Sequence, residues 1–153
     1  MSFAYRCSGN DEQLLVPLYV QICDFGKSRV LGPQGILTTG SYATVTHMAP
    51  EVLARGELSR AGDVYSFGVL LWAMCSGARP WASMSHGQIV STVLSGSPQL
   101  AWPASVPEAL SALGRRCLAM AAGDRPSFSE AAGALEGVSK GYGRMDTGLS
   151  CDA

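Results

Sequence analysis

The most strongly hydrophobic stretch of the chain lies in its middle, over residues 61–77. Its apolar residues surround the helix axis instead of forming a single stripe, which predicts a helix buried at the centre of a domain. Ser59 is a suitable N-cap residue, and Ser76-Gly77 followed by Pro80 marks the end of the helix. The apolar positions that carry this prediction are Val64, Phe67, Val69, Leu70, Leu71, Trp72 and Met74.

Three shorter amphipathic helices are expected after the central one. Apolar positions within residues 89–94 indicate the first, which ends before a glycine and a proline. Ser105 with Glu108 has the pattern of a capping box, and Ser127 with Glu130 repeats it. We therefore expect two further helices to begin at these serines. Their apolar faces would be formed by Leu110, Leu113, Cys117 and Leu118, and by Ala134, Leu135 and Val138.

A hairpin and a long loop are expected before the central helix. Residues 14–16 and 19–23 are rich in apolar and β-branched residues, with Pro17 as a break between them, which predicts two short paired strands. Residues 26–47 are rich in Gly, Ser and Thr and follow neither the strand nor the helix period. This pattern predicts a long loop, and such a loop in a compact domain is usually functional.

The pattern fits one domain, residues 14–138, between two irregular ends. Residues 1–13 show no clear period, and residues 139–153 lose periodicity and gain glycine, which predicts a flexible tail. A length of 153 residues with 47% hydrophobic content supports one core and no more than one domain.

Charge and cysteine content exclude several classes of partner. Lys and Arg number 11 against 12 Asp and Glu, and a net charge of −1 attracts neither nucleic acid nor an anionic membrane. The longest apolar run is shorter than the roughly 20 residues that a bilayer-spanning helix needs. The five cysteines contain no C-x-x-C pair, so we expect reduced thiols and a cytoplasmic location. His47 and His86 have no metal-ligand spacing.

Four short motifs follow one another along the chain. DFG (residues 24–26) comes after the second expected strand, APE (49–51) closes the long loop, DVYSFG (63–68) opens the central helix, and Arg125 precedes the last helix. In this order they resemble the C-terminal lobe of eukaryotic protein kinases over residues from about 20 to 138, and TVTHMAPEVL with DVYSFGVLLW is most similar to the tyrosine-kinase-like group of serine/threonine kinases. The resemblance implies a mainly α fold of the α+β family: a short β-hairpin, an activation loop and about four to five helices.

The resemblance also implies a magnesium and nucleotide site. Asp24 would bind the Mg²⁺ that bridges the ATP phosphates, Phe25 would pack inward, and Gly26 would permit the turn. A turn residue at a strand end is the alternative for Asp24. Asn10 is a weak candidate for a second magnesium ligand, one residue farther from Asp24 than the family spacing, and Tyr5 stands where the catalytic Asp is expected.

The long loop contains the residues expected to be phosphorylated and to face the substrate. In the family this segment is ordered by phosphorylation, although each polar residue here is equally consistent with an ordinary loop. A threonine at position 44 favours serine/threonine over tyrosine specificity, whereas Ala43 replaces the usual glycine. The candidate phosphorylation sites are Thr38, Thr39, Ser41, Tyr42 and Thr44, and the expected substrate loop contains Thr44, Thr46 and His47.

Three charged residues are expected to have structural roles. The family pairs the residues at Glu51 and Arg125 in a buried ion pair. Asp63 would hold the backbone of the catalytic loop. Alternatively, its carboxylate is there only because the positive N-terminal end of the central helix favours a negative charge. Trp81 matches the family's loop after that helix.

Several parts of a kinase are missing from the residues before Asp24. These residues contain no Gly-rich loop, no V-A-I-K lysine, no helix glutamate and no H-R-D catalytic loop, so no catalytic residue is intact. Two functions remain. The chain is a truncated serine/threonine kinase domain, which uses ATP and Mg²⁺ on protein substrates when complete, or it is a non-catalytic remnant that binds a kinase-interacting protein. In both cases we expect exposed apolar surface beside the central helix and no nucleic-acid or membrane partner.

Overall fold

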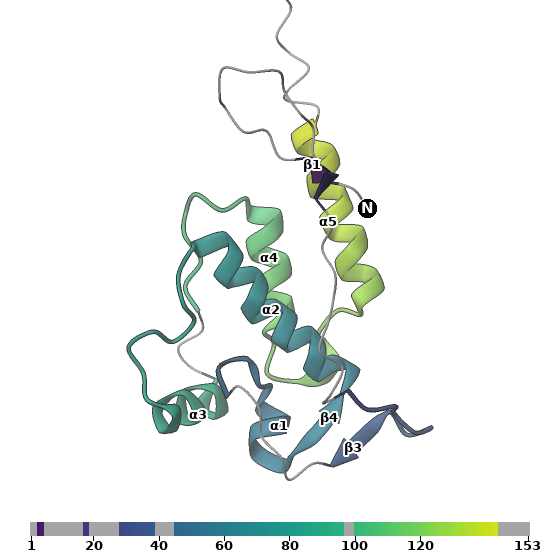
Figure 1. Ribbon diagram of the computed structural model, residues 1–153, viewed down its shortest axis with the longest axis vertical. Coiled ribbons are helices and arrows are strands. Elements are labelled where there is room, and N and C mark those ends of the chain that lie inside the picture. Colours follow the sequence, from purple (N-terminus) through teal and green to yellow (C-terminus); the bar gives the residue numbers. More distant parts are fainter. Residues whose placement is uncertain (1–2, 5–16, 19–27, 39–44, 97–99, 144–153) are drawn as a thin grey trace, which may run out of the picture. The chain divides into compact units, whose positions relative to one another are not determined.

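The computed structural model describes residues 3–4, 17–18, 28–38, 45–96 and 100–143 of the chain (Figure 1). The chain divides into two units, Met1–Val30 and Leu31–Ala153. No helix among the described residues is long and apolar enough to cross a membrane.

The first unit contains an antiparallel pair of very short strands, β1 (Phe3–Ala4) and β2 (Pro17–Leu18). Phe3 lies opposite Leu18, and Ala4 lies opposite Pro17. The sequence predicted Pro17 as a break between two strands, and this is wrong, because Pro17 is itself in a strand. A proline is tolerated there because both strands of a two-stranded pair are edges. The expected strands at 14–16 and 19–23 lie outside the described residues.

The second unit begins with a strand that the sequence did not indicate. β3 (Ile36–Thr38) pairs antiparallel with β4 (Glu57–Ser59), with Leu37 opposite Leu58. The prediction of an unbroken loop over residues 26–47 is therefore wrong at its centre. Three residues are too few to reveal a period, and the pairing partner comes about twenty residues later in the chain.

Two short helical segments lie between these strands. The 3₁₀ helix η2 (Val45–His47) leads into α1 (Pro50–Arg55), which carries the proline of the APE motif in its first turn. Proline at the start of a helix costs no hydrogen bond, because the first N–H groups have no partner within the helix. Gly56 then ends α1 in the left-handed conformation, with φ at 68°.

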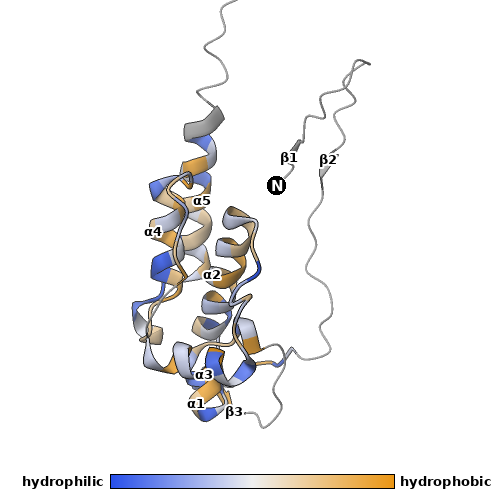
Figure 2. Cartoon of the chain, turned by 90° about the vertical axis from the view of Figure 1, so that its left-hand side faces the viewer, coloured by the Kyte–Doolittle hydropathy of each residue, from blue (hydrophilic) through white to orange (hydrophobic). Residues whose placement is uncertain are grey.

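The predicted central helix is confirmed as α2 (Arg60–Ser76). Ser59 caps it by accepting a hydrogen bond from the Gly62 N–H at 3.1 Å, and Gly77 ends it with φ at 65°. Hydrophobic positions (orange) recur along this helix in Figure 2. Not all of them are buried: Leu70 and Met74 are 47% and 62% exposed. One side of α2 is therefore open in the described part of the chain.

The three later helices are also present, and the start of one of them differs from the prediction. α3 (His86–Ser95) begins with a capping box formed by Ser85 and Gln88. α4 (Glu108–Cys117) begins after Pro107. The predicted capping box at Ser105 is therefore wrong, because a proline pushes the residue before it away from helical geometry.

The last helix is α5 (Phe128–Gly143), and it follows the 3₁₀ helix η3 (Ala122–Asp124). The capping box at its start is confirmed, because Ser127 and Glu130 each bond the other's backbone N–H, at 2.7 and 3.2 Å. The helix continues to Gly143, past the residue at which a tail was expected, and residues 144–153 lie outside the described part.

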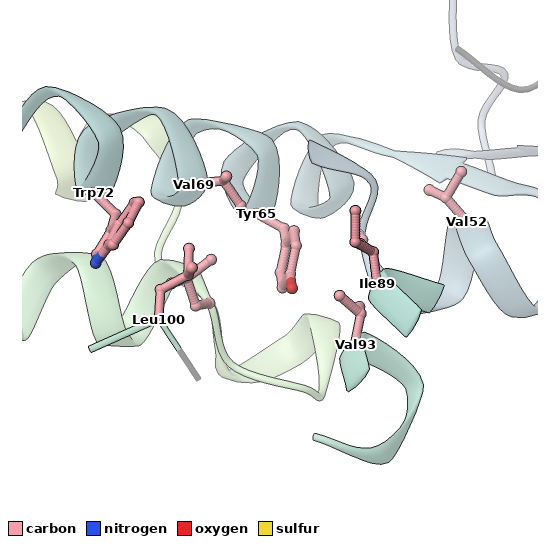
Figure 3. Packing of buried hydrophobic residues seen from close by; sticks show 9 residues of the cluster. Val52, Tyr65, Val69, Trp72, Ile89, Val93 and Leu100 are labelled. Carbon is pink, nitrogen blue, oxygen red and sulfur yellow. The ribbon is translucent and has the colours of Figure 1, made fainter. Parts of the chain in front are cut away.

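α2 supplies side chains to two hydrophobic clusters. Its residues Tyr65, Val69 and Trp72 pack with residues of α1 and α3 (Figure 3). On another side, Val64 and Leu71 pack with residues of α4 and α5. This arrangement confirms the prediction that the helix is central to a mainly helical fold. The partners are Ala49, Val52, Ile89, Val93, Leu100 and Leu118 in the first cluster and Leu113, Cys117 and Ala131 in the second.

Two glycines allow α4 to approach its neighbours closely. A Cβ atom at Gly114 would lie 1.9 Å from Cζ2 of Trp102, and one at Gly68 would lie 2.7 Å from Cβ of Cys117. Both distances are far below van der Waals contact. Position 114 therefore tolerates no side chain unless the indole of Trp102 moves.

We predict that Gly114→Ala lowers the free energy of unfolding by about 1–3 kcal/mol, because the added methyl overlaps a large, rigid ring. Gly133→Ala is the matched control: it also lies within a helix, but its Cβ would meet nothing within 4 Å. That variant should gain about 0.5–1 kcal/mol from its better helix propensity. Urea unfolding of both variants measures the difference, and equal shifts would contradict the prediction.

Candidate functional site

Some of the residues predicted to be functional lie within the described structure, and others lie outside it. Asp24, Phe25 and Gly26 lie outside the described residues, as does Asn10, so the predicted magnesium site stays a prediction. Within the described ranges, no group of three or more His, Cys, Asp and Glu side chains is placed to hold a metal ion. Thr39, Ser41, Tyr42 and Thr44 also lie outside, and Thr38 ends strand β3, where it is exposed.

The remaining predicted residues lie around one short segment, residues 45–51, which we call the anchored segment. It contains Thr46, His47 and Glu51, and it includes η2 and the start of α1. Both ends are bound by side chains from later elements. The candidate site is therefore a short segment anchored at both ends.

One end of the anchored segment is held by a buried ion pair. The two terminal nitrogens of Arg125 donate to the two carboxylate oxygens of Glu51 at 2.7 and 2.9 Å, across 74 positions of sequence. The side chain of Arg125 is fully buried and that of Glu51 is 9% exposed. Two parallel hydrogen bonds between planar charged groups make a strong and directional contact. The predicted pairing has the bidentate geometry expected of a buried pair.

Arg125 also binds three backbone carbonyls. Nε donates to Ala119 at 2.8 Å, Nη1 to Ala61 at 3.0 Å and Nη2 to Met120 at 3.1 Å. Together with the two bonds to Glu51, these use all five N–H groups that a guanidinium carries. The guanidinium carbon also lies 5.1 Å from the centre of the Tyr65 ring. No donor of this buried charge is left unsatisfied, so its desolvation is offset.

Burial and the charge of Arg125 set the pKa values of two groups around the ion pair. Burial by itself raises the pKa of Glu51, but the hydrogen bonds and charge of Arg125 outweigh it and hold that pKa below its usual range. Burial raises the pKa of the Tyr65 phenol to about 12. At neutral pH the carboxylate is therefore charged and the phenol is neutral.

The other end of the anchored segment is held through its backbone. The hydroxyl of Ser66, on α2, donates to the carbonyl of His47 at 2.7 Å. The indole Nε1 of Trp81 donates to the carbonyl of Thr46 at 3.0 Å. Two successive carbonyls are thus bound by side chains of different elements. The sequence indicated neither contact, because nothing in the pattern pairs Ser66 or Trp81 with a loop 19 or 35 residues earlier.

His47 and Thr46 also contact one another. Nδ1 of His47 lies 2.8 Å from Oγ1 of Thr46, and the tautomer of the ring decides which atom donates. Burial lowers the pKa of His47. The neutral imidazole is therefore the form that folding favours.

Asp63 lies in the first turn of α2 and its side chain is exposed. Partial loss of water around the carboxylate raises its pKa. Its position fits an interaction with the positive end of the helix. That role and the predicted contact with a catalytic loop both stay predictions.

We predict that Arg125→Met lowers the free energy of unfolding by about 3–5 kcal/mol, because it leaves Glu51 buried and unpaired. Adding Glu51→Gln to this variant should restore part of the loss, since the buried charge is then gone. Arg116→Met, on the exposed side of α4, is the control and should change stability little. Urea unfolding measures all three, and a loss below about 1 kcal/mol in the single variant would contradict the argument.

We predict that stability falls toward acid in two steps. Because folding lowers the pKa of His47, its contribution is complete above the usual value of about 6.5 and is lost as pH falls below it. The pKa of Glu51 is also lowered, so its contribution is lost only below about pH 4.3. His47→Gln should flatten the slope between about pH 7 and 5 and leave the lower step. Unfolding free energies at a series of pH values test this, and an unchanged slope in the variant would refute it.

Comparison with known proteins relates this geometry to a family. Residues 12–135 match the family described as protein tyrosine and serine/threonine kinase. This range includes the anchored segment, α2 and Arg125, so it covers the ion pair as well as the motifs.

The curated relatives are much longer than this chain. Mitogen-activated protein kinase kinase kinase dlk-1 of Caenorhabditis elegans is 34% identical over 110 residues, which are 72% of this chain and 12% of that protein. Non-receptor tyrosine-protein kinase TNK1 of Mus musculus is 37% identical over 127 residues, 80% of this chain and 19% of that protein. Inactive tyrosine-protein kinase 7 of Gallus gallus is 40% identical over 89 residues, 58% of this chain and 8% of that protein.

The resemblance drawn from four ordered motifs is thus confirmed by a match over more than two thirds of the chain. The chain belongs to the protein tyrosine and serine/threonine kinase family.

Proposed function

We propose that this chain is the C-terminal-lobe part of a protein serine/threonine kinase domain, and that it transfers no phosphate by itself. The observation that carries the proposal is the buried pair of Glu51 and Arg125, which joins the end of the activation segment to the last helices. A buried ion pair is costly to form. A domain that contains this pair therefore contains the contact that fixes its substrate-facing loop.

In a complete kinase domain, the residues present in this chain would have separate roles. Asp24, with Phe25 and Gly26, would hold Mg²⁺ and ATP, and the metal would neutralise charge on the transferred phosphate. The anchored segment, with Thr46 and His47, would position a protein substrate. Thr44 favours serine or threonine as the acceptor. The phosphorylation sites proposed in the activation loop are Thr38, Thr39, Ser41 and Thr44.

The chain by itself lacks the groups that phosphate transfer requires. It contains neither the lysine for the α- and β-phosphates nor the Asp that orients and deprotonates the acceptor hydroxyl. These groups would come from a longer form of the protein, for which a cytoplasmic location is proposed. An in-frame H-R-D sequence upstream in the gene would support this origin.

One observation favours a second candidate function, a non-catalytic module that binds a partner protein. Phe67, Leu70 and Met74 recur on one face of α2, and Leu70 and Met74 are exposed. Phe128 of α5, 48% exposed, continues this face through an edge-to-face contact with Phe67 at 5.9 Å between ring centres. The same face is where the rest of a kinase domain would pack. Stop codons directly upstream of Met1 would favour the binding module.

We predict that the chain transfers no phosphate above background when incubated with Mg²⁺, labelled ATP and a general protein substrate. Asp24→Asn provides the matched control, because it removes only the proposed magnesium ligand and should not differ from the original chain. Radiolabel incorporation measures both. Transfer that depends on Asp24 would overturn the proposal that this chain is inactive by itself.

A further inference from the structure

Trp81 has an unusual backbone conformation for its residue type. Among the described residues it is the one non-glycine with positive φ, at 58°. Its turn follows α2, and Met84 N–H closes the turn by donating to the Trp81 carbonyl at 2.9 Å. Glycine adopts this conformation without cost, whereas a bulky side chain is strained there. A strained residue is retained where its side chain has a task that glycine cannot perform.

Packing holds one side of the Trp81 indole. The ring is partly buried against the first hydrophobic cluster. Together with Tyr65, Val93 and Leu118 it lines a small hollow with room for about one water molecule. A directional contact adds to this packing.

The directional contact is the hydrogen bond from Nε1 of Trp81 to the carbonyl of Thr46. Together with the bond from Ser66 to the carbonyl of His47, it fixes two consecutive peptide planes of the anchored segment. With these carbonyls bound from within the unit, a peptide lying along the segment would have to contact its other groups. The direction of the two carbonyls thus decides which groups of the anchored segment a bound peptide can contact.

We propose that Trp81 is a positioning residue: its indole N–H sets the conformation of the anchored segment and so controls how tightly a serine- or threonine-containing peptide binds there. The peptide part of this inference rests on the proposed function. The hydrogen bond and the left-handed turn are independent of it.

Hydrogen exchange on the chain tests the positioning role. In Trp81→Phe, which keeps an aromatic ring without the donor, the amides of residues 46–48 should exchange about tenfold faster, while the amides of α2 keep their rates. Trp102→Phe is the matched control. It makes the same change at an indole whose N–H has no partner in the described structure, so it should leave residues 46–48 unchanged. Equal rates in Trp81→Phe and the original chain would overturn the proposal.

A second measurement keeps the test valid if Trp81→Phe fails to fold. In the original chain, the indole N–H of Trp81 should exchange more slowly than that of an unbonded indole. Ser66→Ala, which frees the neighbouring carbonyl, should shift the NMR signal of the Trp81 indole. An indole N–H that exchanges freely in the original chain would refute the hydrogen bond and the proposal with it.

Peptide binding tests the functional part. The ¹⁵N-labelled chain is titrated with a mixture of peptides that carry a central serine or threonine and random flanking residues. We expect shifts at the amides of residues 46–48 and an apparent Kd about tenfold higher in Trp81→Phe. No shift in the original chain, or equal affinity in the variant, would overturn the inference. The phosphate-transfer assay judges the proposed function separately, so the two failures are distinguishable.

Discussion

The buried contact between Glu51 and Arg125 is the constraint on which the rest of the described structure depends. It joins α1 to the segment before α5 through two hydrogen bonds, and the same guanidinium binds carbonyls of Ala61, Ala119 and Met120. Charged groups this deep are costly unless every donor is satisfied, and here all five N–H groups of the guanidinium are used. A single side chain therefore sets the relative positions of α1, the start of α2 and the end of α4.

The anchored segment is held by two different physical means. Glu51 holds its far end by charge, whereas Trp81 and Ser66 hold its near end through backbone carbonyls. Backbone anchoring leaves the segment's own side chains able to vary without loss of its shape. Ionic anchoring ties the same segment to the core, where α2 contributes to both hydrophobic clusters. The combination produces a loop with a fixed path, which suits a surface that positions a peptide.

One apolar face of α2 is left open in the described part of the chain. Leu70 and Met74 remain exposed because no described segment covers that side, although the helix was expected to be apolar all round. Exposed apolar residues of this kind mark a surface that another part of a larger domain or a partner buries.

The sequence by itself determined the family, the central helix, its caps at Ser59 and Gly77, and the capping box at Ser127, because these depend on residue type at short, regular spacing. It also carried a missed signal, since Ser85 with Gln88 has the same capping-box spacing. The family resemblance anticipated the pairing of Glu51 with Arg125. The start of α4 after Pro107 was also readable from the sequence, because proline disfavours helical geometry in the residue before it. Only the tertiary structure decided that Trp81 turns left-handed to reach Thr46 and that β3 pairs with β4. These two features depend on contacts between residues far apart in the chain, which no local pattern records.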